Sequence, residues 1–250
     1  MVHHIDFSKI KQSCKDCSLL ELCLPRGLDS SGMERLEEII KRSRPVRRGD
    51  LIFRANDKFT KIYVVRSGTI KLSLLDESGA DQILGFLFPG EIFGLDGIDK
   101  HVHQVSARAI EESTYCAFPF NDLNNVCKEI PELQMQLMRL VSRQLTAENE
   151  LLLTIGKKNA DEKIAIFLLT ISARFHALGY SATEFKLSMS RQDVANYLAL
   201  TIETVSRAFS RLQRDSIIKI DRKIITILDR NALSSLSTSC QGAKKLTGHD

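Results

Sequence analysis

The sequence predicts an α+β fold in which an antiparallel β domain leads into a long helix and then into a helical C-terminal domain. Short β-rich runs separated by turn residues fill residues 45–120. A helical apolar period without interior proline fills residues 131–158, and two further helices with a strand pair follow it. At about 150 residues per domain, a chain of 250 residues is long enough for two modest cores.

Three cysteines near the start form a C-x2-C-x5-C pattern, made of Cys14, Cys17 and Cys23, and Cys116 lies on a predicted strand far along the chain. In a reducing cytosol these thiols stay unpaired, so four thiolates indicate a tetrahedral zinc, a [4Fe–4S] cluster or a [2Fe–2S] cluster. Structural zinc sites more commonly pair two C-x2-C units, so three clustered cysteines with a distant fourth favour iron–sulfur. We expect the remaining Cys127 and Cys240 to be buried free thiols.

A short capped helix over residues 33–40 precedes the β-rich region. The predicted strands are residues 51–53, 61–65, 69–75, 82–87 and 113–118, with turn signals such as Gly49-Asp50 and Pro89-Gly90 between them. Strands at this spacing, without helical crossovers, predict an antiparallel roll, barrel or sandwich. His101 and His103 would share one face of a strand, and we interpret this pair as solvated surface rather than as a metal site.

The long helix over residues 131–158 carries a stripe of side chains that recur every three or four residues. Such a stripe is often a core face, but a helix between two domains has few neighbours to bury it. A parallel coiled coil with a second copy of the chain is therefore the favoured interpretation. The residues expected at that dimer interface are Leu137, Val141, Leu145, Glu148, Leu152 and Ile155.

A charged stretch at residues 157–162 marks the passage to the C-terminal domain, where residues 188–214 predict a helix, a short break and a second helix. This spacing fits a helix-turn-helix, whose second helix enters the DNA major groove. Glu203 can accept a hydrogen bond from a cytosine amine, Arg207 can donate two to guanine, and Ser206 can contact either strand. Thr201 and Thr204 complete the expected DNA-binding set. The alternative is a plain helical hairpin with surface charges.

Two features beside this motif favour the DNA-binding interpretation. Two short strands over residues 217–220 and 223–228 suggest a winged helix. Residues 157–250 hold 15 Lys+Arg against 9 Asp+Glu, whereas residues 1–156 hold 20 against 22, so a net charge of +4 divides into +6 and −2. A basic C-terminal part suits a polyanionic partner.

Several function classes are not expected. The chain has no apolar run near the roughly 20 residues that cross a bilayer and no signal-peptide pattern, so we expect a cytoplasmic protein without a membrane partner. It also lacks a phosphate-binding glycine loop, a G-x-S-x-G elbow and an H-E-x-x-H motif, so we expect no enzyme.

The three predicted parts, in this order, resemble the CRP/FNR family of bacterial transcription regulators. Residues 49–53, 63–71 and 89–94 are similar to the family's cyclic-nucleotide-binding-like β-roll. The cysteine pattern and residues 202–207 resemble the oxygen-sensing FNR branch more specifically. Residues 101–108 lack the arginine followed by Ser or Thr with which cyclic-AMP receptors of the family grip the phosphate.

The resemblance implies a β-roll sensor domain, a dimerisation helix and a C-terminal winged helix-turn-helix. It implies a [4Fe–4S] cluster on Cys14, Cys17, Cys23 and Cys116 that oxygen degrades to a [2Fe–2S] form and then to apoprotein. The expected protein is an oxygen-responsive homodimer that activates or represses transcription in the anaerobic response. Its expected partners are double-stranded DNA, at palindromic TTGAT and ATCAA half-sites, and RNA polymerase, for which the loop at residues 76–81 is a candidate contact.

Two residues depart from the usual pattern of this family. Glu148 would bring like charges together across a dimer axis, unless it lies at the edge of the stripe and faces water. Ala199 occupies a turn position where glycine is common, so the turn forms without a positive φ or with some strain. A regulator of the same fold that senses a small molecule, a zinc-stabilised DNA-binding protein and an enzyme that uses a cluster are the remaining alternatives.

These expectations divide the chain into five parts. They are a cysteine-rich segment at 1–28, the β-roll at 29–130, the dimerisation helix at 131–158, the winged helix-turn-helix at 159–235 and a polar tail at 236–250.

Overall fold

A computed structural model describes residues 13–75 and 81–238 of the chain. The chain divides into two compact units, residues 1–149 and 150–250, and the division falls inside the long helix. Cys240 and the expected tail beyond residue 238 lie outside the described residues, as does most of the loop at 76–81. No helix of the described part combines the length and apolar character needed to cross a membrane.

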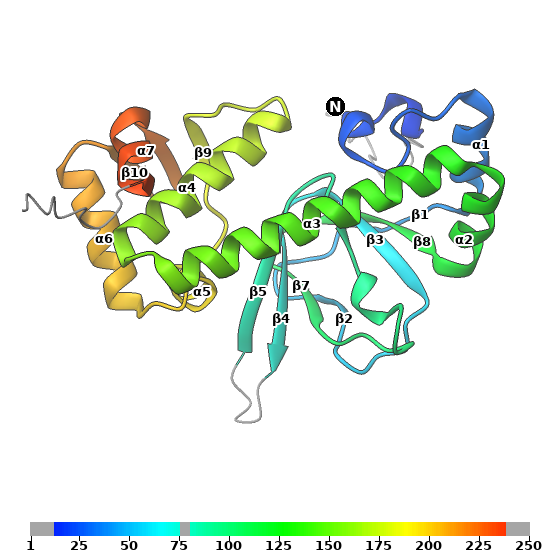
Figure 1. The fold of residues 1–250 in the computed structure, drawn as a ribbon, viewed down its shortest axis with the longest axis horizontal. Coiled ribbons are helices and arrows are strands. Elements are labelled where there is room, and N and C mark those ends of the chain that lie inside the picture. Colours follow the sequence, from blue (N-terminus) through cyan, green and yellow to red (C-terminus); the bar gives the residue numbers. More distant parts are fainter. Residues whose placement is uncertain (1–12, 76–80, 239–250) are drawn as a thin grey trace, which may run out of the picture. The chain divides into compact units, whose positions relative to one another are not determined.

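The N-terminal unit contains two four-stranded antiparallel sheets (Figure 1), with strand orders β1-β8-β3-β6 and β2-β7-β4-β5. Side chains from both sheets share one core that includes Phe53, Val65, Ile70 and Phe93. The antiparallel β domain predicted from the turn spacing is therefore confirmed. The strands are β1 Lys41–Arg42, β2 Leu51–Phe53, β3 Lys61–Ser67, β4 Ile70–Leu75, β5 Asp81–Leu87, β6 Ile92–Phe93, β7 Ser106–Ala109 and β8 Thr114–Pro119.

A second core joins the cysteine-containing segment to the sheets through helices α1 (Ser30–Ile39), α2 (Phe120–Glu129) and the start of α3 (Pro131–Lys157). Leu24, Leu36 and Leu133 are completely buried there. Helix α1 begins after Asp29, whose side chain accepts a hydrogen bond from the Gly32 N–H at 2.7 Å. Cys127 is buried in the same core, as expected.

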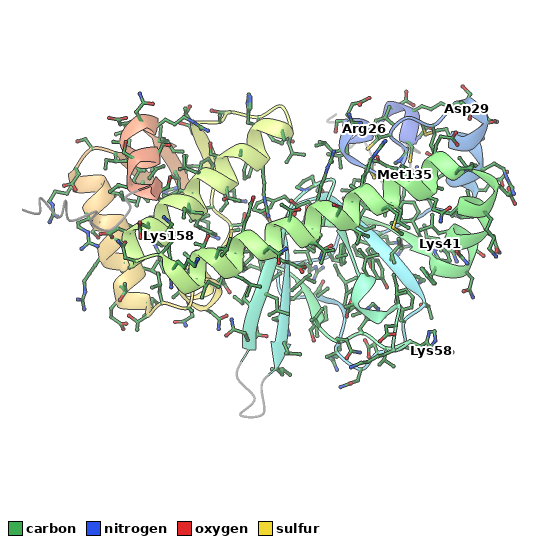
Figure 2. All side chains as sticks on the ribbon, in the orientation of Figure 1. Arg26, Asp29, Lys41, Lys58, Met135 and Lys158 are labelled. Carbon is green, nitrogen blue, oxygen red and sulfur yellow. The ribbon has the colours of Figure 1, made fainter. Side chains whose placement is uncertain are left out.

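Helix α3 buries one side of its first half and exposes the other. Leu133, Gln136 and Leu140 are buried, whereas Met135, labelled on this helix in Figure 2, is 54% exposed. The helix begins at Pro131, which suits a first helical position because its missing N–H has no intrahelical partner there.

The C-terminal unit combines helices α4 (Ala160–Ala177), α5 (Arg191–Tyr197), α6 (Ile202–Arg214) and α7 (Arg230–Thr238) with a three-stranded sheet. The sheet has the order β10-β11-β9, formed by Ile218–Asp221, Ile224–Ile227 and Glu184–Lys186. A helix-turn-helix followed by an antiparallel strand pair confirms the predicted winged arrangement. Helix α7 runs through residue 236, where the sequence led us to begin the polar tail.

The interpretation of His103 as solvated surface was wrong. Its side chain is 1% exposed, its ring stacks on Phe53 with centroids 3.7 Å apart, and its Nδ1 lies 3.2 Å from an Asp96 carboxylate oxygen. Burial alone would raise the pKa of Asp96, but the hydrogen bonds from His103 and two backbone N–H groups lower it overall. His101 is exposed, so the two histidines do not form a pair.

Candidate functional site

The four cysteines singled out by the sequence line one cavity in the N-terminal unit. Cys14, Cys17 and Cys23 come from the N-terminal segment, and Cys116 comes from strand β8. The cavity has a volume of about 350 Å³ when its opening to solvent is included. Its other lining residues are mostly apolar and comprise Leu19, Leu20, Pro25, Val64, Val65, Arg66 and Phe118.

Short 3-10 turns fold the three N-terminal cysteines around the cavity. The Cys17 N–H donates to the Cys14 carbonyl oxygen at 3.2 Å, and the Leu20 N–H donates to the Cys17 carbonyl oxygen at 3.0 Å. The buried Gln136 of α3 then holds the end of the segment, because its Nε2 donates to the Cys23 carbonyl oxygen at 3.1 Å. Polar backbone groups around the cavity are thereby satisfied by nearby partners.

Strand β8 brings Cys116 to the same cavity from a distant part of the sequence. Cys116 is paired with Val64 of β3 on one side and with Arg42 of β1 on the other. An interior position in the sheet gives this cysteine a rigid backbone, in contrast to the turns that carry the other three.

Burial favours the neutral form of three of the cavity's thiols, those of Cys14, Cys23 and Cys116. It raises the pKa of Cys14 far above its usual value, helped by the neighbouring Glu37 carboxylate, and raises the pKa of Cys23 to about 12. Burial also raises the pKa of Cys116, although the positive charges of Arg42 and Arg66 act in the opposite direction. Metal binding by these thiols would release protons, because the thiolate is the ligand.

The donor set suits an iron–sulfur cluster. Four thiols border one cavity with apolar walls, and two guanidinium groups lie close enough to act on a thiol. Cysteine thiolates are the usual ligands of such clusters, and surrounding charge and apolar shell tune the bound cluster. Among residues 13–75 and 81–238, no three His, Cys, Asp or Glu side chains are grouped to hold a single metal ion.

The helix-turn-helix occupies α5 and α6 in the C-terminal unit. Val205, Ala208, Phe209 and Leu212 form the buried face of α6. Glu203, Ser206 and Arg207 are exposed on the N-terminal half of this helix, where a recognition helix contacts base edges.

The two expected threonine contacts have a structural role at the start of α6. The Thr201 side chain accepts a hydrogen bond from the Thr204 N–H at 3.2 Å, and the two hydroxyls lie 2.9 Å apart. Thr201 is exposed and Thr204 is half-buried. Thr201 therefore caps α6, and its bond with Thr204 holds the first turn where the three exposed side chains begin.

One contact that sequence reasoning missed joins the two helices of the helix-turn-helix, and the turn between them adopts one of the two forms expected. The Arg191 guanidinium lies 3.4 Å from the centre of the Phe209 ring, a cation–π contact between α5 and α6. The turn between these helices includes Ala199 with φ = 51°, so the turn does form in the left-handed region, with strain. The cation–π contact had no sequence signal, because nothing in the local pattern pairs Arg191 with Phe209.

The stripe expected on α3 is divided between two faces. Leu137 packs against the N-terminal core, whereas Leu145 and Leu152 are 56% and 68% exposed. Met138, which the sequence analysis left out, is 53% exposed. With Met138 in place of Leu137, the positions alternate steps of three and four residues, as in a heptad repeat, through Met138, Val141, Leu145, Glu148, Leu152 and Ile155.

Comparison with known proteins agrees with this architecture. Residues 43–130 match the cyclic nucleotide-binding domain family, and residues 162–236 match the Crp-like helix-turn-helix domain family. The chain is similar to the transcriptional activator protein Anr of Pseudomonas protegens, with 46% identity over 90% of this chain and 92% of that protein. It is 40% identical to the fumarate and nitrate reduction regulatory protein of Vibrio cholerae, over 90% of each chain.

A solved structure, that of FixK2 from Bradyrhizobium japonicum, matches 81% of this chain and 99% of its own chain. The TM-score is 0.73 and the sequence identity 27%. Helix-turn-helix regulators of this kind bind DNA and are dimeric. Because identity above 40% extends over nine-tenths of the chain, and both domain families occur in the expected order, this chain belongs to the CRP/FNR family of transcription regulators, among those of the Anr and FNR type.

Proposed function

We propose that this regulator senses oxygen through a [4Fe–4S] cluster held by Cys14, Cys17, Cys23 and Cys116. The observation that carries the proposal is the cavity that these four cysteines border together. Three of its ligands lie in a segment of short turns and the fourth lies in a sheet, so a cluster would tie the segment to the β domain. When bound, the cluster would be the group that reacts with oxygen. Its loss would remove the connection between the segment and the β domain.

The cluster proposal extends to dimerisation through α3. The exposed heptad positions Met138, Leu145 and Leu152 form an apolar strip on a helix, which is the pattern that a parallel coiled coil buries. Glu148 lies within this strip and is exposed. Two copies would bring these carboxylates together, so association would depend on the additional order that the cluster gives to the N-terminal unit.

DNA binding by the dimer is proposed to use Glu203, Ser206 and Arg207 for base contacts. An exposed carboxylate and guanidinium four residues apart lie on one side of α6, where they suit cytosine and guanine edges. Two such helices in a dimer would contact half-sites about one helical turn apart, of the TTGAT and ATCAA type. We propose RNA polymerase as the further partner at the regulated promoters.

The direct test of the cluster is the metal and sulfide content of protein purified without oxygen. We expect about four irons and four acid-labile sulfides per chain, with a broad absorption band near 400 nm that changes when air is admitted. Single changes to Ser at each of the four cavity cysteines should abolish this band. Cys127→Ser, the control for a buried thiol outside the cavity, should keep it.

Two other outcomes would replace the proposal. Zinc without sulfide would make the four cysteines a structural clamp and would remove oxygen sensing. If the purified protein contains neither metal nor sulfide, the result would instead indicate a regulator that responds to a small molecule bound in the β domain.

A further inference from the structure

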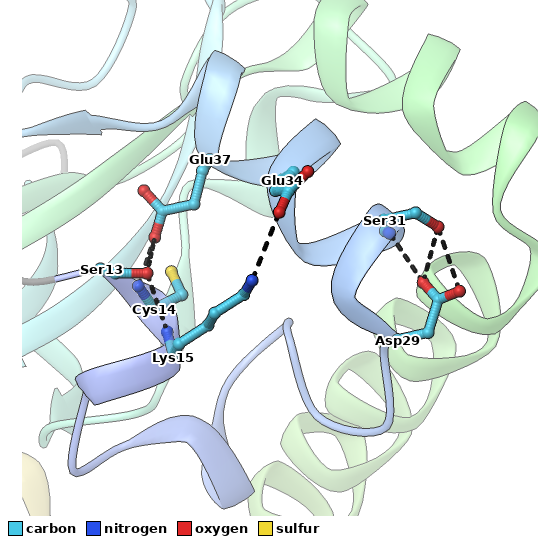
Figure 3. Close-up of polar contacts among 8 residues, drawn as sticks. Ser13, Cys14, Lys15, Asp29, Ser31, Glu34 and Glu37 are labelled. Atoms are coloured by element: carbon cyan, nitrogen blue, oxygen red, sulfur yellow. Dashed lines mark hydrogen bonds and ion pairs between the residues drawn. The ribbon is translucent and has the colours of Figure 1, made fainter.

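Glu37 of α1 contacts the cysteine segment (Figure 3) and, on its other side, strand β1. Its carboxylate accepts a hydrogen bond from the backbone N–H of Cys14. The Arg42 guanidinium donates to the same carboxylate, with its Nη2 at 2.8 Å and 2.7 Å from the two oxygens. One side chain of α1 therefore connects the first cysteine of the segment to the edge of the sheet.

Arg42 lies close to two of the four cysteines. Its Nη2 is 3.8 Å from the Cys14 sulfur, and its backbone is paired with Cys116 across the β1–β8 ladder. The ion pair thus spans the gap between a residue on a turn and a residue fixed in the sheet. Cys14 and Cys116 are also the first and last of the four cysteines in the sequence.

The pair is sheltered enough to hold its geometry. The Glu37 and Arg42 side chains are only 24% and 26% exposed, and charge-assisted hydrogen bonds of this kind are stronger than neutral ones. A second ion pair, Lys15 with Glu34, also joins the cysteine segment to α1 (Figure 3). That pair is 3.4 Å long and much more exposed, so it contributes little.

We propose that Glu37 and Arg42 are positioning residues that hold Cys14 beside Cys116 and so determine how long the cluster survives in air. The inference rests on the proposed cluster function. Without the pair, Cys14 would lie on a segment free to move away from the sheet, and its thiol would no longer be held beside that of Cys116. The Arg42 guanidinium would also offset part of the negative charge that four thiolates bring into an apolar cavity.

The test compares Glu37→Gln with Glu34→Gln, the matched control on the same helix. In the metal-free full chain, amide hydrogen exchange of peptides covering residues 13–22 reports how firmly the segment is held. In anaerobically reconstituted protein, the decay of visible absorbance after admission of air reports cluster lifetime. We expect Glu37→Gln to speed cluster decay by about 10- to 100-fold, the usual cost of losing an outer contact of a metal ligand. It should speed exchange of the segment by about tenfold or more, because a hydrogen bond to a charged group is lost. Glu34→Gln should change neither.

A second variant protects the test against a folding defect in α1. Arg42→Met leaves that helix untouched and breaks the same Glu37–Arg42 ion pair, so it should also speed exchange and cluster decay. The double variant should cost less than the sum of the two single variants, because the two residues share that ion pair. Cluster lifetimes and exchange rates equal to those of Glu34→Gln would overturn the inference. If the unmodified chain binds no iron or sulfide, the proposed cluster function fails, and unchanged exchange in Glu37→Gln alone would then overturn the positioning role.

Discussion

The Lys163 ammonium of α4 donates a hydrogen bond to the backbone carbonyl oxygen of Leu198, at 3.2 Å. Lys163 is only 7% exposed, and Leu198 is the C-cap residue directly after α5. The last carbonyl oxygens of a helix have no intrahelical donor, and a cation there also interacts favourably with the helix dipole. A buried lysine therefore fixes the end of α5 immediately before the turn that leads to α6.

Replacing this lysine should destabilise the C-terminal unit. Lys163→Met keeps the length of the side chain but leaves the Leu198 carbonyl oxygen buried without its donor. We expect a loss of about 1.5–3 kcal/mol in the free energy of unfolding, the usual value for a hydrogen bond to a charged group. Urea unfolding followed by circular dichroism measures it, with the exposed Lys157→Met as control. Equal midpoints for the two variants would show that the contact contributes nothing.

The turn at Ala199 should be improved by glycine. A non-glycine residue in the left-handed region costs about 1–2 kcal/mol, and the greater freedom of glycine in the unfolded chain offsets about half of this gain. We expect Ala199→Gly to raise stability by about 0.5–1 kcal/mol and to leave DNA affinity unchanged. Ala173→Gly, at an exposed position inside α4, should instead lower stability by about 1 kcal/mol. If Ala199→Gly melts at a lower temperature than the unmodified protein, the backbone at Ala199 is not strained.

The base-reading residues should affect specificity as well as affinity. Glu203→Ala and Arg207→Ala should each cost about 1–3 kcal/mol at the best site and relax the preference at one base pair. Arg214→Ala, at the C-terminal end of the same helix, should weaken binding equally at all sequences or not at all. Binding to a panel of half-sites with single substitutions separates these effects. An unchanged preference would remove that residue from base reading.

The sequence was sufficient for the architecture because periodicity and turn residues are local signals. The spacing of glycine-containing turns predicted the antiparallel sheets, and the pattern of residues 188–214 predicted the pair of helices α5 and α6. The cysteine spacing identified the four thiols that border the cavity. Their common location depends on the pairing of Cys116 with Arg42, which no local pattern encodes.

Contacts between polar residues that are distant in the chain could not be predicted from the sequence. Glu37 belongs to a helix whose pattern describes only its apolar face, so its bond to Cys14 has no signature. His103 was assigned to the surface because a histidine pair in a loop-rich region is more often solvated surface than a metal site, yet the fold buries it against Phe53 and Asp96. Leu137 and Met138 are both apolar, and only the packing of α3 on the core shows which one is exposed.

The apolar strip of α3 should control self-association. Leu145→Ala should raise the dimer dissociation constant by about tenfold or more, because burial of a leucine side chain contributes roughly 1.5–3 kcal/mol. Leu153→Ala is a matched control, since Leu145 and Leu153 are both 56% exposed but only Leu145 lies at a heptad position. Sedimentation of the cluster-containing protein gives both constants. Equal effects of the two variants would place the dimer interface elsewhere.

Glu148 should oppose the same association. It lies at a heptad position between Leu145 and Leu152. Its carboxylate accepts a hydrogen bond from the neutral Gln144 amide at 3.2 Å, which does not offset its charge. Glu148→Ala should therefore lower the dimer dissociation constant of the metal-free protein by about tenfold, which corresponds to about 1.4 kcal/mol. The neighbouring exposed Glu150→Ala, off the strip, should change it little. If the monomer–dimer balance in air is the same for both variants, Glu148 faces water at the edge of the interface and does not make dimerisation depend on the cluster.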